Sequence, residues 1–387
     1  MKNITIIFSA LVLIHVCACN SGKKSDLTGF KQIYVDPDKT ERINVADYFK
    51  YSSFIVLETT NDNLIAKIDK VQIFDSKIYV MDIQQNSVYI FDENGKYLRK
   101  IYRRGGGPEE YIYLTDFNID SKNGNIQVYD GLSGRILNYT NEGQFLNKKE
   151  VSKGYSFISL KNNRWMFYSH YGSDKGFYNL NICDENFAVT DVYLPFPKYL
   201  DGRTYTLGIT NSIFSEYNNI LHILPLLSNR IYAYNRTANG IEGKYEIVFA
   251  GQKRSYFDEN SSENEVKKAL SSFGNETASH IHGFYSLNSL VLFKFSYRRT
   301  IHSCLYDELT DKTICDEKVL TDEHGLFFYP AVYFSDKGQN QILSIMDIEY
   351  LNRSKQKNPT NAVIQEISEA VKVEDSNPIL VFYEVKR

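Results

Sequence analysis

The chain has little proline, little cysteine and no excess of positive charge. Its 387 residues include 8 prolines and 5 cysteines, and the formal net charge is −3 at pH 7. So few prolines leave little room for disordered linkers, and without a basic surplus we expect no nucleic-acid partner. The chain also has no G-x-S-x-G motif, and so it lacks the nucleophile signature of the α/β-hydrolases.

The apolar run at the N-terminus is short. It extends from Ile4 to Val16, which is too few residues for a comfortable membrane span. It follows Lys2 and leads into Cys17-Ala18-Cys19, and this segment resembles the lipobox of bacterial lipoproteins with Cys19 as the acylated residue. An uncleaved anchor or an ordinary signal peptide is the alternative.

We therefore expect residues 1–18 to be a lipoprotein signal peptide and residues 19–45 to be a lipidated tether and lead-in. The lipid on Cys19 would hold the protein to a membrane of the cell envelope. The stretch after Cys19 is basic, whereas an acidic run at this point directs some Bacteroidetes lipoproteins to the cell surface. This favours a periplasm-facing protein.

A repeated unit identifies the β architecture. Residues 77–98 and 125–146 align with a constant shift of about 48 residues, so that Asp82 falls on Asp130. A unit of this length is typical of propeller blades, and it cannot bury its apolar faces alone. The aromatic content of 14% also suits half-buried strands. We predict an all-β fold, a six-bladed β-propeller over residues 46–387.

The sixth blade lacks an outer strand of its own. Its inner strand is predicted at AVYFSD (331–336), and its last strand at ILVFYEVK (379–386). We expect FIVLET (54–59) to pair with this last strand, because an exposed edge would otherwise remain. The ring would then be closed by strands from both ends of the chain.

Two short helical inserts interrupt the strands. One is expected at about 258–278, where Ser262-x-x-Glu265 is a capping box, and the other at about 354–376. Both are interpreted as covers packed on the ring.

The stretch from Arg103 to Leu146 resembles an NHL repeat, through GGGPEEY (105–111) and GRILNYTNEGQFL (134–146). The whole chain resembles the six-bladed β-propeller lipoproteins common in Bacteroidetes. The resemblance implies a β-propeller fold and a location in the cell envelope. It implies no reaction, since propellers host unrelated functions.

The loop RRGGGPEEY (103–111) is rich in glycine. It does not bind phosphate by any known motif, because no Lys-Ser/Thr follows and no helix is expected to begin there. We expect its glycines to adopt positive φ in a tight crossing between blades. Arg103, Arg104, Glu109 and Glu110 are candidates for a ligand surface at the face of the ring.

Asp82 and Asp130 end equivalent strands. We expect their carboxylates to accept hydrogen bonds from backbone N–H groups of the following turn. A catalytic carboxylate pair is the alternative.

His280 and His282 are the candidate metal ligands. Their spacing places both imidazoles on one face of a strand, which by alignment is the innermost of its blade and lines the central channel. The resemblance adds that some NHL-type lyases and propeller hydrolases bind metals in that channel. The alternative is that both histidines lie packed under the adjacent helical insert.

Cys304 and Cys315 lie symmetrically about one predicted turn, at 308–311. They should therefore sit opposite each other across a strand pair, where an oxidising compartment allows a disulfide. Two reduced, buried cysteines are the alternative.

A full set of blade signals without a complete catalytic constellation favours a binding function. We expect a membrane-tethered, monomeric binding or scaffold module for an envelope protein, a peptide or a glycan, with no cofactor. The alternative is a metal-dependent hydrolase or lyase whose site lies in the central channel.

Overall fold

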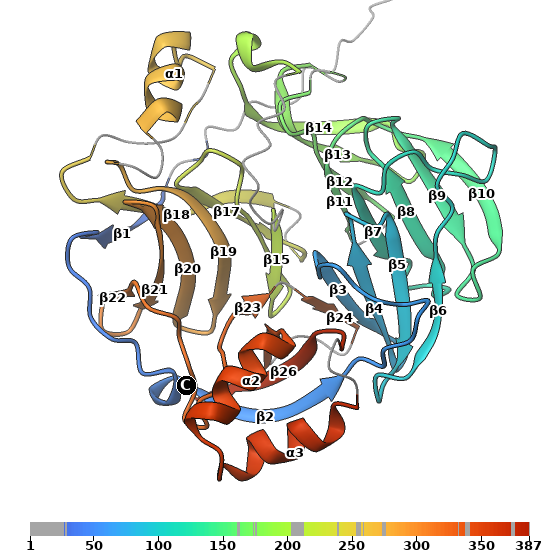
Figure 1. Ribbon diagram of the computed structural model, residues 1–387. Coiled ribbons are helices and arrows are strands. Elements are labelled where there is room, and N and C mark those ends of the chain that lie inside the picture. The colour runs from blue at the N-terminus through green and yellow to red at the C-terminus, as the bar shows by residue number, and fades with distance from the viewer. Residues whose placement is uncertain are drawn as a thin grey trace, which may run out of the picture.

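The computed structural model shows a ring of six β-sheets (Figure 1). This confirms the predicted six-bladed β-propeller. The structure describes residues 27–386 except for 28, 161–162, 173, 175, 203–212, 238–239, 253–256, 258, 273–275, 332, 337–340 and 373–375. Cys19 and the predicted signal peptide therefore lie outside the described residues.

Blades 1 to 3 share one plan, in which antiparallel strands run outward from the centre of the ring in chain order. Blade 1 consists of β3 (Lys70–Phe74), β4 (Lys77–Asp82), β5 (Ser87–Asp92) and β6 (Tyr97–Ile101). Blade 2 consists of β7 (Asp116–Ile119), β8 (Ile126–Asp130), β9 (Arg135–Tyr139) and β10 (Phe145–Glu150). Blade 3 consists of β11 (Ser156–Ser159), β12 (Trp165–Tyr168), β13 (Tyr178–Cys183) and β14 (Val189–Pro195).

Blades 4 and 5 keep this order, and blade 4 gains a strand. Blade 4 consists of β15 (Phe214–Tyr217), β16 (Ile220–Ile223), β17 (Arg230–Asn235) and β18 (Gly240–Phe249). Blade 5 consists of β19 (Ser279–Leu287), β20 (Leu290–Tyr297), β21 (Thr300–Asp307) and β22 (Lys312–Asp316). The added strand is β1 (Lys31–Val35), which pairs in parallel with β18. The sheets thus begin at Lys31, earlier than the expected boundary at residue 46.

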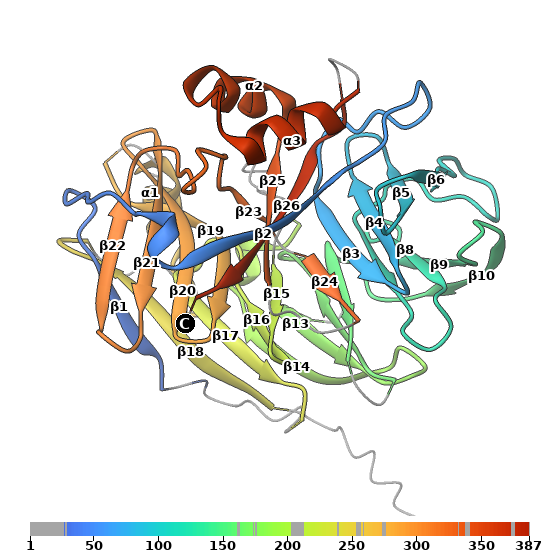
Figure 2. The same ribbon diagram turned by 90° about the horizontal axis from the view of Figure 1, so that it is seen from below.

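Blade 6 joins the two ends of the chain. It consists of β23 (Pro330–Ala331), β25 (Gln341–Met346), β26 (Ile379–Val385) and, outermost, β2 (Phe49–Val56). Strand β2 crosses the blade antiparallel to β26, with Phe54 opposite Val381 (Figure 2). The predicted closure of the ring is confirmed.

The inner strand of blade 6 differs from its prediction. The segment expected as one strand at 331–336 divides, and its second half forms β24 (Tyr333–Ser335). Strand β24 pairs in parallel with β3 of blade 1, and it lies near the centre of the ring beside β15 (Figure 1). The chain therefore crosses from blade 6 to blade 1 and narrows the central channel.

The two helical inserts contain three helices. The first insert holds α1 (Glu263–Ser272), where Ser262 Oγ accepts from the Glu265 N–H and Glu265 Oε2 accepts from the Ser262 N–H, as the capping box predicts. The second is a pair, α2 (Ile348–Lys357) and α3 (Ala362–Ala370), rather than one helix at 354–376. Within the described residues, no helix is both long and apolar enough to cross a membrane.

The outer hairpins of the first three blades share one turn. In blade 1 the Asp92 carboxylate accepts from the N–H groups of Asn94 and Lys96, and Gly95 has φ +82°. Thr140 and Asp184 accept in the same way in blades 2 and 3. This repeated turn explains the shared spacing of the repeats, because it sets the register of each hairpin.

Tyrosines fill the seams between blades. Tyr129 of blade 2 donates to the Ser152 carbonyl at 2.7 Å. Tyr285 of blade 5 donates to the Pro330 carbonyl of blade 6 at 2.9 Å. The aromatic wealth of the sequence therefore serves packing, and these two buried rings also satisfy backbone carbonyl groups next to them.

Candidate functional site

The glycine-rich loop 103–111 is a compact crossing between blades 1 and 2. Its N–H and C=O groups pair across the loop, from Gly105 N to Tyr111 O at 3.0 Å and from Tyr111 N to Arg103 O at 3.0 Å. None of its three glycines has positive φ, so that expectation is wrong. A side chain at Gly105 would instead displace the Glu110 carboxylate, because a Cβ there would lie 2.0 Å from Glu110 Oε2.

The four charged residues of this loop divide into two groups. Glu110 turns inward, and its carboxylate accepts from the Gly107 N–H at 2.7 Å. Arg103, Arg104 and Glu109 are exposed on the surface. Glu110 thus stabilises the loop, and only the other three remain available as a candidate ligand surface.

Asp82 and Asp130 are fully buried and play the same structural part. Asp82 accepts from the Gln85 N–H at 2.9 Å, and Asp130 accepts from the Ser133 N–H at 3.3 Å, as predicted. Each also binds the loop that enters its own blade, through the N–H groups of Ala66 and Ile112 respectively. Each carboxylate therefore ties the start of a blade to its second strand.

The candidate metal ligands lie on an innermost strand, as expected. His280 and His282 belong to β19, where His282 is buried opposite Lys294. The register of β19 shifts on both sides of His282, which interrupts the regular alternation of faces. The side chain of His280 lies outside the described residues. Among the side chains that are described, no three His, Cys, Asp or Glu come together as a metal site.

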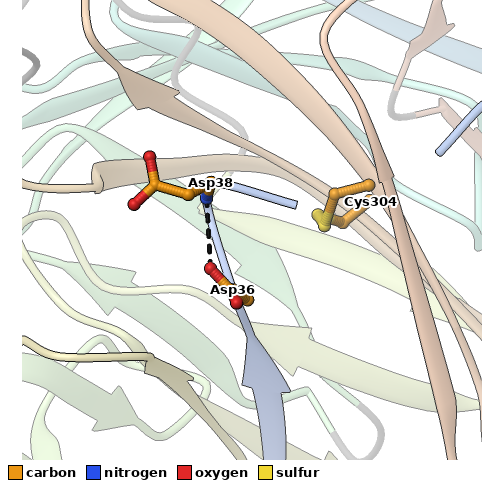
Figure 3. The surroundings of a disulfide bond; sticks show 4 residues. Asp36, Asp38 and Cys304 are labelled. Atoms are coloured by element: carbon orange, nitrogen blue, oxygen red, sulfur yellow. Dashed lines mark hydrogen bonds between the residues drawn. A yellow bond between two sulfur atoms is a disulfide. The ribbon is translucent and has the colours of Figure 1, made fainter. Parts of the chain in front are cut away.

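Cys304 and Cys315 face each other across β21 and β22. Their Cα atoms are 4.2 Å apart and a disulfide joins them. Figure 3 shows the bond beside the segment after β1, where the Asp38 N–H donates to Asp36 Oδ1. A groove of about 310 Å³ runs between that segment and blade 5, and Cys315 lines it.

Polar side chains connect the innermost strands of blades 1, 2 and 3. Lys70 Nζ donates to Asp116 Oδ1 at 2.7 Å and to the Phe117 carbonyl at 2.8 Å. The other Asp116 oxygen accepts from the Phe157 N–H of blade 3 at 3.0 Å. Burial raises the pKa of Asp116, and the Lys70 ammonium opposes this shift. Three blades thus meet at one buried carboxylate.

A second set of polar side chains lies further along the same innermost strands. Gln72 bonds Asn118 at 3.3 Å, and Asn118 Nδ2 lies 3.4 Å from Ser159 Oγ. The Ser159 carbonyl accepts from Arg236, whose guanidinium forms a bidentate pair with Glu216 of β15 at 2.7 and 2.8 Å. The row therefore reaches from blade 1 to blade 4.

The opposite side of the ring holds buried basic groups in apolar surroundings. Neither ring nitrogen of His222, on β16, has a hydrogen-bond partner in the described part of the chain. Burial lowers its pKa to about 3, with a further contribution from Lys244. A cavity of about 20 Å³, which has room for about one water molecule, lies beside it and is also lined by Glu216 and Tyr333.

Lys294 on β20 is the second such group. Its Nζ lies 3.0 Å from the centroid of the Tyr329 ring. Burial lowers its pKa to about 7, so the amine is only partly protonated near neutral pH. The ring face of Tyr329 compensates part of the lost hydration.

Strand β24 seals the inner end of the network. The Phe334 ring lies over the Lys70 ammonium, with 5.1 Å between Nζ and the ring centroid. Tyr333, the residue before it, donates to the Gln341 carbonyl of blade 6 at 3.1 Å. The protein's own chain therefore occupies the place where a propeller channel would admit a ligand.

A larger groove of about 730 Å³ lies outside the channel. It is bounded by β2, by the C-terminal end of α3 and by the turn between β5 and β6 (Figure 2). Its lining consists of residues 53–59 and 93–96 together with Ala370, Lys372 and Ser376. Four of the lining residues, Ser53 to Val56, belong to β2 at the edge of its sheet.

Sequence reasoning missed the polar network and this groove. A signal for the network is present, because Lys70 and Gln72, like Asp116 and Asn118, alternate with apolar residues on innermost strands. The same alternation is typical of any half-exposed strand, so it identified no site by itself. The groove leaves no local signal, since its walls come from segments more than 250 residues apart.

A family assignment follows from comparison with known sequences. The family described as "Domain of unknown function (DUF4934)" matches residues 30–384. The chain belongs to this family. No curated protein matches it.

Solved structures include several similar propellers. A Bacteroides fragilis protein described as exported is 16% identical to this DUF4934 chain, with a TM-score of 0.73 over 92% of this chain and 100% of its own. A member of the DUF4221 family from Bacteroides vulgatus is 12% identical, with a TM-score of 0.49 over 87% of this chain and 97% of its own. At such identities the similarity shows the fold alone.

Proposed function

We propose that this DUF4934 protein is a lipid-anchored propeller of the cell envelope that serves as a binding or scaffold module for a protein, peptide or glycan. The observation that carries the proposal is the contrast between the channel and the outer surface. The channel is crossed by β24 and its polar side chains bind one another, whereas an open groove of about 730 Å³ lies on the outside.

The anchor in this proposal is a lipid on Cys19, with the protein facing the periplasm. The lipobox-like segment that ends at Cys19 is the sequence feature that supports it. Cells labelled with an alkyne fatty acid should incorporate the label into the protein. Cys19→Ser should abolish labelling and release the protein from the membrane fraction. Unchanged labelling would exclude Cys19 as the anchor.

The binding function is tested by a screen of the full chain, purified in detergent. The probes are peptidoglycan fragments, a glycan array and a panel of peptides, and saturable binding of one class is expected. Binding should survive His282→Ala, because the proposal places no ligand at that position. Turnover of any substrate that is lost on substitution of a channel residue would contradict the proposal and support the alternative, a metal-dependent hydrolase or lyase at His280 and His282.

A further inference from the structure

The outermost strand of blade 6 carries fewer charged residues than the outer strands of blades 1 and 2, and Lys50 is the one charge on it. Strand β2 is the outermost strand of its sheet, so within the part of the chain that the structure describes no strand pairs with the N–H and C=O groups of its outer side. Residues 51–57 of this edge carry no charge. By contrast, the outer strand of blade 1 carries Arg99 and Lys100, and that of blade 2 carries Lys148, Lys149 and Glu150.

Charged side chains normally protect an exposed edge from pairing with another chain. Their absence from residues 51–57 leaves this edge open to an added strand. Phe54, Ile55 and Val56 are only partly buried, so they also offer apolar contacts in the groove. Main-chain pairing with pockets for alternate side chains is the mode by which sheets take up extended peptides.

The walls of the groove define the length and position of such a strand. At one end, Glu58 closes it, because the Glu58 N–H donates to the Gly95 carbonyl at 2.8 Å and the Glu58 carboxylate accepts from the Tyr97 N–H at 2.8 Å. Along the side, the rim is formed by Ala370 at the last position of α3. A small residue at this position leaves room between helix and strand.

The ring already accepts added strands elsewhere. Strand β1 pairs in parallel with β18 as a fifth strand at the outer edge of blade 4. Strand β24 is a fifth strand on blade 1. Blade 6 has four strands, so an added strand at β2 would repeat an arrangement that the fold uses twice.

We propose that the groove beside β2 binds an extended peptide segment of a partner protein, which pairs with residues 51–54 as a fifth strand of blade 6, because the turn at Gly95 packs against Ile55 and Val56. This deepens the proposed binding function and rests on it. The partner is a peptide rather than a glycan, because the lining includes the backbone of a strand edge, and Phe54 is the one aromatic residue among the lining residues that the structure describes.

The test uses the full chain in detergent and a phage-displayed library of linear heptapeptides. Enriched sequences are expected to alternate apolar and polar residues, because a paired strand presents alternate side chains to the groove. Their affinities are then measured by fluorescence anisotropy. N-methylation at every second residue should abolish binding, since it removes the donors of the strand pairing.

Two alanines of the same helix provide matched variants. Ala370→Trp fills the groove and should weaken peptide binding at least about tenfold. Ala362→Trp, on the exposed first residue of α3, should leave it within about twofold. Ser53→Lys is the second groove variant, and it replaces Ala370→Trp if that variant melts at a lower temperature than the parent.

Three outcomes would overturn the inference. A peptide affinity that both groove variants leave unchanged would exclude this site. The proposed binding function would then remain intact. The absence of any enriched peptide, or glycan binding that the groove variants abolish, would exclude a peptide as occupant. A dimer that Ser53→Lys dissociates would show that the edge pairs with a second copy instead.

Discussion

The two sides of the central channel bury polar groups in different ways. Along blades 1 to 3, the Lys70 ammonium lies against the Asp116 carboxylate and two amides bridge the neighbouring strands. In blades 4 and 5, His222 and Lys294 are buried with lowered pKa values of about 3 and about 7. The first side pairs its buried ammonium with a carboxylate of the next blade, whereas on the second side burial shifts His222 and Lys294 toward their neutral forms.

This difference matters for the origin of stability. A buried charge with a hydrogen-bonded partner can hold two sheets in one register, while an unpaired basic group costs free energy whenever it is protonated. The fold therefore gains rigidity at blades 1 to 3. At blades 4 and 5 it tolerates the free-energy cost of burying basic groups. Three substitutions separate these contributions.

The largest effect is expected from breaking the Lys70–Asp116 pair. Asp116→Leu leaves the Lys70 ammonium buried without its carboxylate and should lower the free energy of unfolding by about 3 to 5 kcal/mol. The double variant Lys70→Met/Asp116→Leu should recover most of this loss. Urea unfolding at fixed pH measures both, and equal losses in the single and double variants would show that the pair is not coupled.

The next effect has the opposite sign. Lys294→Met removes an amine whose pKa is lowered to about 7, so it should stabilise the protein at pH 7 by about 2 to 4 kcal/mol. The pKa of Lys294 in the folded protein lies below the usual 10.5. The free energy of unfolding of the wild-type protein therefore decreases as pH falls from 10.5 to 7. Lys267→Met on the exposed face of α1 is the control and should change the stability by less than about 0.5 kcal/mol. A destabilised Lys294→Met variant would mean that the Tyr329 contact outweighs the cost of burial.

The third effect appears only in the dependence of stability on pH. His222 stays neutral in the folded protein down to a pKa of about 3, whereas an unfolded chain protonates it near its usual 6.5. The titration of His222 therefore leaves the free energy of unfolding unchanged above pH 6.5. It lowers that free energy as pH falls toward 3, by at most about 1.4 kcal/mol per pH unit. His222→Phe should reduce the slope of the free energy of unfolding against pH by this amount between pH 6.5 and pH 4. His170, with a pKa lowered to about 4, retains its own share in both proteins. Parallel profiles for wild type and variant would contradict the assignment.

Much of the fold was predictable from sequence, because the repeat is local. The shift that superposes Asp82 on Asp130 fixes the blade length, and the missing outer strand of blade 6 requires a donor from the N-terminus. Helix α2 was missed since only Leu351 and Ser354 of its residues are buried, which leaves almost no apolar periodicity. The crossing of β24 was missed because AVYFSD reads as one strand whichever blade receives it.

The candidate site was less predictable, for a physical reason. Lys70 and Asp116 meet only because adjacent blades place their innermost strands side by side, and that geometry appears in no single repeat. The loop at 103–111 was identified as structural, but the inward turn of Glu110 depends on the space left by Gly105. Contacts between blades decide these roles, and local patterns do not contain them.

The central claim is that the channel maintains the ring while the groove beside β2 binds the partner. The most direct measurement compares Asn118→Leu with Ala370→Trp, recording for each the melting temperature and the affinity for a heptapeptide enriched on the wild-type protein. We predict that Asn118→Leu lowers the melting temperature and leaves the affinity unchanged, because it removes hydrogen bonds between and within blades around the channel and lies outside the lining of the groove. Ala370→Trp should lower the affinity at least about tenfold and leave the melting temperature unchanged. An affinity that falls in Asn118→Leu and is retained in Ala370→Trp would place the binding site in the channel and contradict the account.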